Sequence, residues 1–312
     1  MGLDPQVKML LQQLEANGAP PLESLPPIYA RQAFESLEAN SEEPQEPVHI
    51  VEDRSIPGPS EDIKVRVYTP EGAGPHPALV FCHGGGWVIG SLDTHDNVCR
   101  ALTNLADCVV ISIDYRLAPE HKFPAAVDDC YAVVKWIADQ PSIFNIDPSR
   151  IAVGGDSAGG NISAVISYLA KERGTPQLVH QLLIYPSTDF TAETASMREN
   201  AEGYFLTRGS MVYFRDHYLQ TPEDAENPLA SPILIEDFSG LPPATVITAE
   251  YDPLRDEGEA YGRRLKEAGV PVVLTRYDGM IHGFVSMADK LDQGKRALEQ
   301  AGNELRISFE RY

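Results

Sequence analysis

The chain has 312 residues, of which 43% are hydrophobic and 23% are charged, so it is long enough to bury a large core and is unlike a disordered or fibrous protein. Lys and Arg number 25 against 46 for Asp and Glu, which gives a formal net charge of −21. This charge repels nucleic-acid phosphates and anionic lipid headgroups, so we expect a small-molecule partner, no nucleic acid and no membrane.

The first 47 residues predict two helices that are appended to the main fold. Residues 4–17 carry apolar side chains at helical spacing, with Asp4 as the N-cap and Gly18 as the stop. A second helical stretch covers roughly residues 28–39 and ends in the acidic, proline-containing segment 40–47.

Neither the N-terminus nor the cysteines indicate secretion. Asp4, Pro5 and Lys8 break up the first ten residues, where a signal peptide needs an apolar run, so no secretion signal is expected. The cysteines lack Cys-x-x-Cys spacing and are interpreted as buried reduced thiols, at Cys82, Cys99, Cys108 and Cys130. We therefore expect a cytoplasmic protein.

From Val48 onward the pattern predicts an α/β fold. Residues 63–68 alternate with period two, as in a strand with one solvated face, and the early strands are expected to be antiparallel. Six short apolar runs follow, at residues 78–82, 108–113, 150–153, 182–185, 244–248 and 272–274. The first three are each followed by a helix-like segment, near residues 95–106, 124–139 and 158–173. This alternation is typical of a mostly parallel, doubly wound sheet with helices on both faces.

Two further segments stand out in the second half of the chain. Residues 189–220 are polar at first and then aromatic-rich, and they are too long for an ordinary connection between strands, so we interpret them as an inserted lid. The last helix-like segment, residues 291–308, is a candidate surface for a homodimer.

The strongest chemical signal is Gly155-Asp156-Ser157-Ala158-Gly159, which directly follows the apolar run 151–153 and directly precedes a helix-like segment. A nucleophile on a sharp strand-to-helix turn needs small neighbours, since larger side chains would collide with the adjacent strand and helix. The helix N-terminus then lets backbone N–H groups, including that of Ala158, face a developing oxyanion. The alternatives are a glycine-rich turn or a phosphate loop, but no Lys-Ser or Lys-Thr follows, as a phosphate loop requires.

A second signal is His83-Gly84-Gly85-Gly86-Trp87, at the end of the run 78–82. Three consecutive glycines let the backbone approach a ligand closely and point N–H groups at an oxyanion. A flexible turn would also be glycine-rich, but flexibility does not account for the flanking His83 and Trp87.

A serine nucleophile needs a base and an orienting acid. Among eight histidines, His282 is favoured because it follows Ser157 in the chain and lies in a predicted loop, residues 279–284, after the last strand. Asp252 ends the apolar run that begins at Ala244, where a carboxylate could hold the imidazole tautomer. Its nearest rivals are interpreted as helix-start or turn carboxylates, at Asp256 and Asp278.

With these motifs in order, the chain resembles the hormone-sensitive-lipase-like (family IV) carboxylesterases of bacteria and archaea, within the α/β-hydrolase superfamily and the subgroup marked by a Gly-Asp-Ser-Ala-Gly elbow. The matching segments are residues 83–87, Asp114-Tyr115-Arg116-Leu117-Ala118-Pro119-Glu120, residues 154–160, Asp252-Pro253-Leu254-Arg255-Asp256 and Ile281-His282-Gly283-Phe284.

The resemblance implies roles for these residues. Ser157 would be the nucleophile, His282 the base and Asp252 the orienting acid. The oxyanion hole would come from Ala158 and the loop of Gly84, Gly85 and Gly86, of which the second and third glycines are the better candidates. Asp114, Tyr115, Arg116 and Glu120 would brace loops, and no cofactor or metal is expected.

The resemblance also implies a division of the chain. Residues 1–47 and 189–220 would form a helical cap, and residues 48–188 and 221–312 the two parts of the α/β-hydrolase core. Cap side chains would line the substrate pocket, including Phe34, Phe205, Leu206 and Phe214, although any one of these could instead belong to the core of the cap.

The leading hypothesis is hydrolysis of small esters with short to medium acyl chains, through an acyl-enzyme intermediate. An amidase or deacetylase acting on arylamides or acetylated small molecules would use the same triad. A receptor without catalytic activity, built on a hydrolase fold, is the alternative from another class, but such proteins have typically lost the base.

Overall fold

The computed structural model describes residues 2–39 and 45–311, without the side chains of residues 37–39. Residues 40–44, part of the acidic segment predicted to follow the second helix, lie outside the described residues.

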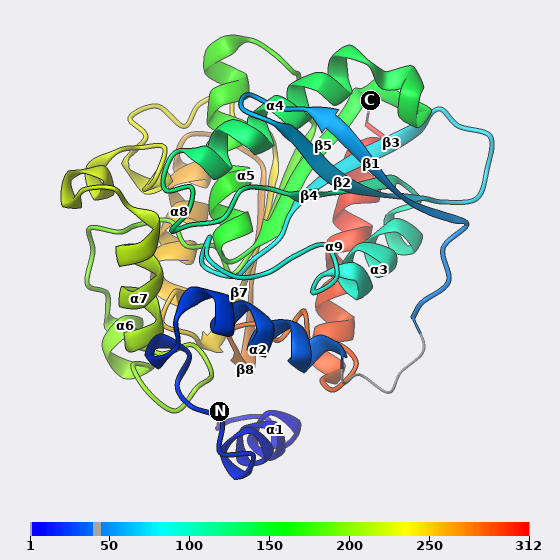
Figure 1. Ribbon diagram of the computed structural model, residues 1–312. Helices are drawn as coiled ribbons and strands as arrows, with labels where there is room; N and C mark the ends of the chain where they lie inside the picture. The colour runs from blue at the N-terminus through cyan, green and yellow to red at the C-terminus, as the bar shows by residue number, and fades with distance from the viewer. Residues whose placement is uncertain (1, 40–44, 312) are drawn as a thin grey trace.

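An eight-stranded sheet forms the centre of the molecule, in the order β1-β2-β4-β3-β5-β6-β7-β8 (Figure 1). Its strands are β1 Ile50–Pro57, β2 Asp62–Thr69, β3 His76–Cys82, β4 Val109–Asp114, β5 Ile146–Asp156, β6 His180–Ile184, β7 Ala244–Tyr251 and β8 Val272–Ile281. β2 pairs antiparallel with both β1 and β4, whereas all pairs from β4 to β8 are parallel. Every residue of β6 is buried, as expected for a strand covered on both faces.

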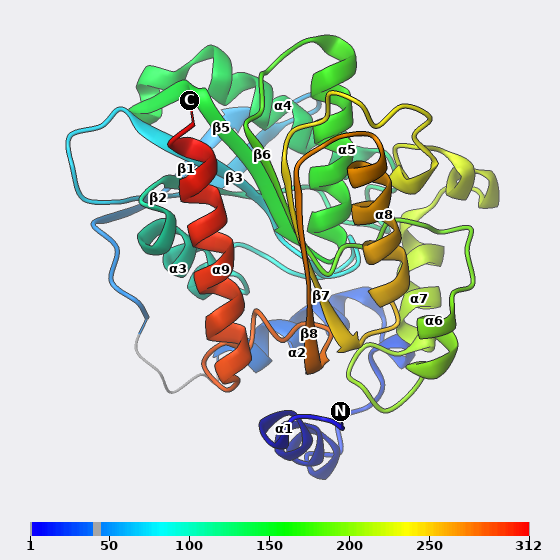
Figure 2. The same ribbon diagram turned by 180° about the vertical axis from the view of Figure 1, so that it is seen from behind.

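Helices cover both faces of this sheet. They are α1 Pro5–Ala16, α2 Pro27–Ala39, α3 Asp96–Ala106, α4 Ala125–Asp139, α5 Ala158–Arg173, α6 Ala195–Glu199, α7 Arg208–Tyr218, α8 Arg255–Glu267 and α9 Asp292–Phe309. α3 and α9 lie side by side on one face, and α4, α5 and α8 lie on the other (Figures 1 and 2). The predicted doubly wound α/β fold is therefore confirmed.

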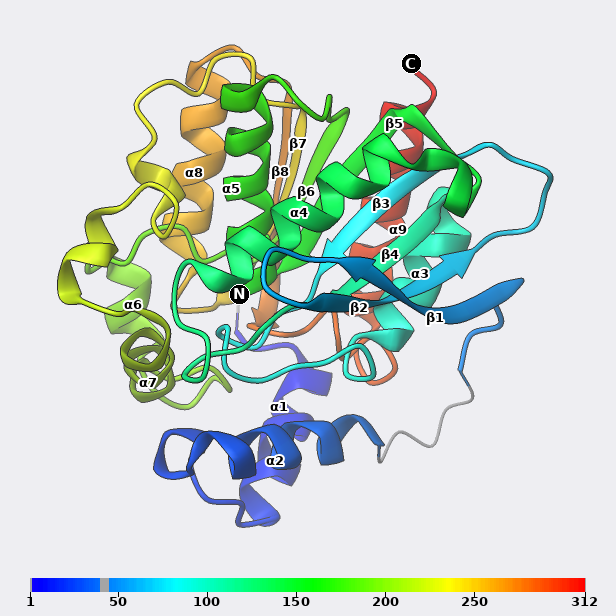
Figure 3. The ribbon, with the colours of Figure 1, turned by 45° about the horizontal axis from the view of Figure 1, so that its top comes forward.

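The remaining helices lie at the end of the sheet where the parallel strands finish. α1 and α2 cross this end below the strand tips, with α6 and α7 beside them (Figures 1 and 3). Asp4 caps α1 as predicted, because its side chain accepts a hydrogen bond from the Gln6 N–H over 2.8 Å. Segments from opposite halves of the sequence are thus brought together at the carboxyl ends of the strands.

The sequence interpretation is wrong at the last strand. β8 continues through Gly279 to Ile281, so only residues from His282 onward lie outside it, and the exposed Asp278 is a strand residue instead of a turn carboxylate. β8 is an edge strand whose apolar run covers only residues 272–274 and is followed by polar residues, so the sequence pattern marked the start of this strand but not its end.

One side of the last helix, the candidate dimer surface, packs inside the chain. The apolar side of α9 is buried within the chain, where it packs on α3 and on the sheet, through residues such as Ala297, Leu298, Ala301 and Leu305. A homodimer through residues 291–308 stays a prediction from the sequence, and it would use the opposite side of this helix.

All four cysteines are buried, and none of them forms a disulfide. In the described part of the chain, no helix is both long enough and apolar enough to cross a membrane.

Candidate active site

Ser157 lies at the sharp turn between β5 and α5. Its φ of +54° is in the left-handed region, which is strained for a residue with a side chain. The turn is held by two backbone hydrogen bonds, from the Ser157 N–H to the Ile184 carbonyl over 2.8 Å and from the Asn161 N–H to the Ser157 carbonyl over 3.1 Å. The serine hydroxyl is thereby raised above the sheet at the start of a helix.

The glycines beside Ser157 are required by space. A Cβ atom at Gly155 or at Gly159 would overlap the carbonyl oxygen of Cys82, at the end of the adjacent strand β3. The predicted need for small residues on both sides of the serine therefore has a specific cause, which is the close approach of β3 to the turn.

The structure brings Ser157, His282 and Asp252 together. His282 Nε2 lies 2.9 Å from Ser157 Oγ, and His282 Nδ1 lies 2.7 Å from Asp252 Oδ2. Asp252 is fully buried, and its other carboxylate oxygen accepts a hydrogen bond from the Leu254 N–H over 2.8 Å. With the proton on Nδ1, as the neighbouring carboxylate favours, Nε2 can accept the hydroxyl proton of Ser157.

Asp256, considered above as a rival for the acid, faces another part of the molecule. It lies in the first turn of α8 and accepts a hydrogen bond from the Ser196 N–H over 2.8 Å.

The glycine-rich loop lies next to Ser157, but its three glycines differ in what their N–H groups can do. The Gly84 N–H donates to Asp156 Oδ1 over 2.8 Å and is therefore already engaged. Gly85 and Gly86 line the cavity together with Ser157 and Ala158. Both have positive φ, of +114° and +58°, which explains why glycine occupies these positions.

Asp156 has a role that the sequence did not reveal. Its carboxylate is buried and also lies 3.1 Å from Nε2 of His95, a histidine that no motif singled out. Burial alone would raise the pKa of Asp156, but His95 and the Gly84 N–H together hold this pKa below its usual value. Asp156 is therefore a buried anion that connects the Ser157 turn with the glycine loop.

Three of the four residues expected to brace loops, Tyr115, Arg116 and Glu120, form contacts between segments. The Tyr115 hydroxyl donates to the His83 carbonyl over 2.8 Å, and its ring stacks on His83 with centroids 4.3 Å apart. Arg116 forms a bidentate ion pair with the buried Asp129, and Glu120 forms one with Arg31 of α2.

A cavity of about 1150 Å³ opens over Ser157. All four side chains expected in the pocket line it, namely Phe34, Phe205, Leu206 and Phe214. The Phe214 ring lies so close to Gly86 that a Cβ there would overlap it, whereas a Cβ at Gly283 would lie 3.3 Å from the Phe205 ring. These two rings thus lie beside the glycine loop and beside the turn that carries His282.

Within residues 2–39 and 45–311, no group of three or more His, Cys, Asp or Glu side chains is arranged to hold a metal ion.

A family model described as alpha/beta hydrolase fold matches residues 79–286. The chain belongs to this alpha/beta-hydrolase family. It is 45% identical over 293 residues to the carboxylic ester hydrolase LipN of Mycobacterium tuberculosis, covering 91% of this chain and 77% of LipN. It is 35% identical over 309 residues to the ethyl acetate hydrolase of Pseudomonas putida, covering 96% of each.

Among solved structures, an ester hydrolase from the metagenome of Lake Arreo, in complex with a bipyridine phosphonate derivative, superposes with a TM-score of 0.96. It is 44% identical in sequence, and the match covers 99% of both chains. The resemblance to hormone-sensitive-lipase-like carboxylesterases is thereby confirmed, and this alpha/beta hydrolase is a carboxylic ester hydrolase with a small-molecule ester as its substrate.

Proposed function

We propose that this carboxylic ester hydrolase works through Ser157 as nucleophile, His282 as base and Asp252 as orienting acid. The observation that carries the proposal is the position of the His282 ring, whose two nitrogens lie 2.9 Å from the serine hydroxyl and 2.7 Å from the carboxylate. Hydrogen-bonding contact between nucleophile and base, with the base oriented by a third group, is the arrangement that activates a serine.

In the first half of the reaction, Ser157 Oγ attacks the ester carbonyl while its proton passes to His282 Nε2. The negative charge on the carbonyl oxygen is stabilised by the N–H groups of Gly85, Gly86 and Ala158. When the tetrahedral intermediate collapses, the bond to the alcohol breaks and His282 returns the proton to the leaving oxygen. An acyl group then remains esterified to Ser157.

In the second half, water takes the place of the alcohol. His282 accepts a proton from the water, whose oxygen attacks the acyl carbonyl, and the same N–H groups stabilise the second oxyanion. Collapse breaks the bond to Ser157 Oγ, which takes the proton back from His282, and the carboxylic acid is released.

We further propose that residues 1–47 and 189–220 form a cap over the core parts 48–188 and 221–312, and that the substrates are small esters of short to medium acyl chain. The cavity is covered by side chains from α1, α2 and α7, which supports a substrate enclosed in a pocket. The name of the ethyl acetate hydrolase, with its two-carbon acyl group, supports a short chain.

Three finer points stay predictions from the sequence. They are membership of the subgroup with the Gly-Asp-Ser-Ala-Gly elbow, a cytoplasmic location, and a homodimer.

Hydrolysis of p-nitrophenyl esters from acetate to palmitate, by the wild type and by folded Ser157→Ala, tests the proposal. We expect a maximum at short to medium chains and loss of activity in the variant. Faster hydrolysis of emulsified long-chain triglycerides than of soluble butyrate esters would contradict the proposed preference for short to medium acyl chains. Full activity of Ser157→Ala would contradict the nucleophile, and preference for an amide over its matched ester would favour the amidase alternative.

A further inference from the structure

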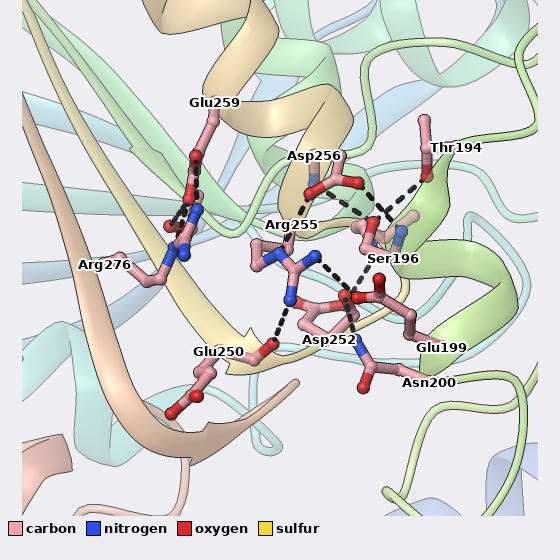
Figure 4. A network of polar contacts seen from close by, with 12 residues as sticks. Thr194, Ser196, Glu199, Asn200, Glu250, Asp252, Arg255, Asp256, Glu259 and Arg276 are labelled. Atoms are coloured by element: carbon pink, nitrogen blue, oxygen red, sulfur yellow. Dashed lines mark hydrogen bonds and ion pairs between the residues drawn. The ribbon is translucent and has the colours of Figure 1, made fainter. Parts of the chain in front are cut away.

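The inserted helix α6 is hydrogen-bonded to the loop that carries Asp252 (Figure 4). The Asn200 side-chain NH₂ donates to the Asp252 carbonyl over 3.2 Å. The Ser196 hydroxyl donates to the Pro253 carbonyl over 2.8 Å and accepts from the Asp256 N–H over 3.1 Å. Two polar side chains of the insertion thus form hydrogen bonds with three backbone groups of this loop, the carbonyls of Asp252 and Pro253 and the N–H of Asp256.

Both side chains are buried, since Ser196 is 0% and Asn200 is 4% exposed. Buried carbonyl and N–H groups require partners, and within the loop itself the Asp252 carbonyl accepts one hydrogen bond, from the Arg255 N–H over 3.1 Å. The polar identity of Ser196 and Asn200 is therefore explained by the loop that they contact. Two apolar residues here would remove the Ser196 donor from the Pro253 carbonyl and the second of two donors from the Asp252 carbonyl.

A second layer of contacts surrounds these hydrogen bonds. Arg255, at the start of α8, donates to Glu199 Oε2 of α6 over 3.0 Å and to the Glu250 carbonyl over 3.0 Å. The Ser196 N–H also donates to Asp256 Oδ2 over 2.8 Å. Figure 4 shows that these groups enclose the backbone at Asp252 from the side of the insertion.

We propose that Ser196 and Asn200 are positioning residues that set the orientation of Asp252 toward His282. The described lining of the cavity includes Met197 of the same helix but neither Ser196 nor Asn200, so neither of these side chains forms part of the cavity wall. They act through the backbone of residues 252–256, whereas the Asp252 side chain is fixed locally by the Leu254 N–H. The segment that covers the cavity therefore also aligns the proposed triad.

This role rests on the proposed triad, so the experiment separates the two. Ser196→Ala combined with Asn200→Ala is measured in the wild type and in the Asp252→Asn background, on a soluble p-nitrophenyl ester. In the wild type, kcat should fall about tenfold or more while KM changes less than about twofold, because a misplaced base slows chemistry without removing a substrate contact. In the Asp252→Asn background the same pair of substitutions should lower kcat by less than about twofold.

A matched control is Ser167→Ala, which removes another buried serine hydroxyl, one that donates to the Ser163 carbonyl within α5. It should leave kcat unchanged. A second readout is the proton NMR signal of the His282 Nδ1–H in the wild-type background, which should shift or broaden in the Ser196/Asn200 double variant and not in the control.

Each outcome decides a different point. An equal loss of kcat with and without Asp252, or no loss at all, overturns the positioning role and leaves the triad standing. If Asp252→Asn alone keeps wild-type activity, the proposed acid is wrong and the positioning role fails with it.

Discussion

The backbone N–H of Gly84 donates a hydrogen bond to Asp156 Oδ1 over 2.8 Å, so the residue before the proposed nucleophile holds the glycine loop in place. Replacing Asp156 by Ala removes this acceptor, and kcat should fall about tenfold to a hundredfold as the N–H groups of Gly85 and Gly86 lose their positions. Asp156→Asn keeps an oxygen for Gly84 and should retain more activity. Steady-state kinetics on folded variants check this, and wild-type kcat in Asp156→Ala would refute it.

The proposed base predicts how activity depends on pH. A protonated His282 cannot accept the proton of Ser157, so kcat/KM should fall as the solution becomes acidic. The check is a profile of kcat/KM from about pH 5 to pH 8, with chemistry shown to be rate-limiting. A flat profile over this range would argue against His282 as the base.

Close packing at one end of α5 predicts a large difference between two glycine substitutions. At Gly159 a Cβ would overlap the Cys82 carbonyl, whereas Gly174 at the other end of the helix has φ +70° and open space around it. Gly159→Ala should therefore destabilise the fold by about 3 kcal/mol or more, and Gly174→Ala by only about 1 kcal/mol of backbone strain. Urea unfolding of both variants checks the ranking. Equal destabilisation would mean that β3 can move away from position 159 without a loss of folding free energy.

The parts of the site that the sequence predicts are those with local patterns. An apolar run, a glycine-flanked serine and a helix are contiguous around Ser157, so the strand, turn and helix can be recognised from one short segment. His282 and Asp252 lie far from Ser157 in the chain and were found only through the order of motifs. Their contact depends on the parallel strands ending at one edge of the sheet, where β5, β7 and β8 present the three residues.

The contacts that the sequence does not predict join single residues from distant segments. His95 and Asp156 are 61 positions apart, and neither the short polar stretch around His95 nor the small residues around Asp156 indicate a pairing. Ser196 and Asn200 likewise belong to a five-residue helix and its C-cap, too short for a periodic signal. Such pairs are decided by tertiary packing, for which one sequence gives no local pattern.

The contacts of Arg31 join α2 to the core and should contribute to the free energy of unfolding. Its guanidinium donates to the Val88 and Ala118 carbonyls, each over 2.8 Å, and pairs with both oxygens of Glu120. Arg31→Ala should cost about 2 kcal/mol, because it removes charge-assisted donors from two backbone carbonyls. Arg31→Lys should restore only part of this stability, since an ammonium group does not reproduce the planar fork.

Glu120→Gln separates the ion pair from the carbonyl contacts of Arg31. The Glu120 side chain is 55% exposed, so the pair alone should contribute less than about 1 kcal/mol. The hydrogen bond from Arg31 lowers the pKa of Glu120, and this contribution is therefore present at neutral pH and lost as the carboxylate is protonated in acid. Denaturant unfolding at neutral pH checks both variants, and an equal effect of Arg31→Ala and Glu120→Gln would show that the carbonyl contacts contribute nothing.

The buried Glu257 should make the protein less stable as the pH rises, which is the opposite of the effect expected from Glu120. This carboxyl is 2% exposed in the first turn of α8, and burial raises its pKa to about 8, although the N–H groups of Thr188 and Asp189 favour its charged form. A pKa raised above the unfolded value means that the stabilising contribution is complete below about pH 4 and is lost as the pH rises through about 8.

The neutral variant Glu257→Gln tests this sign, since it keeps an oxygen for the two N–H groups and does not titrate. Between about pH 5 and pH 9, its free energy of unfolding should therefore rise relative to that of the wild type. Urea unfolding at both pH values measures the difference, with Glu267→Gln at the exposed end of the same helix as the control. A difference between Glu257→Gln and the wild type that stays constant across this range would mean that Glu257 is already ionised in the folded protein at neutral pH. The N–H groups of Thr188 and Asp189 would then outweigh the cost of burying its charge.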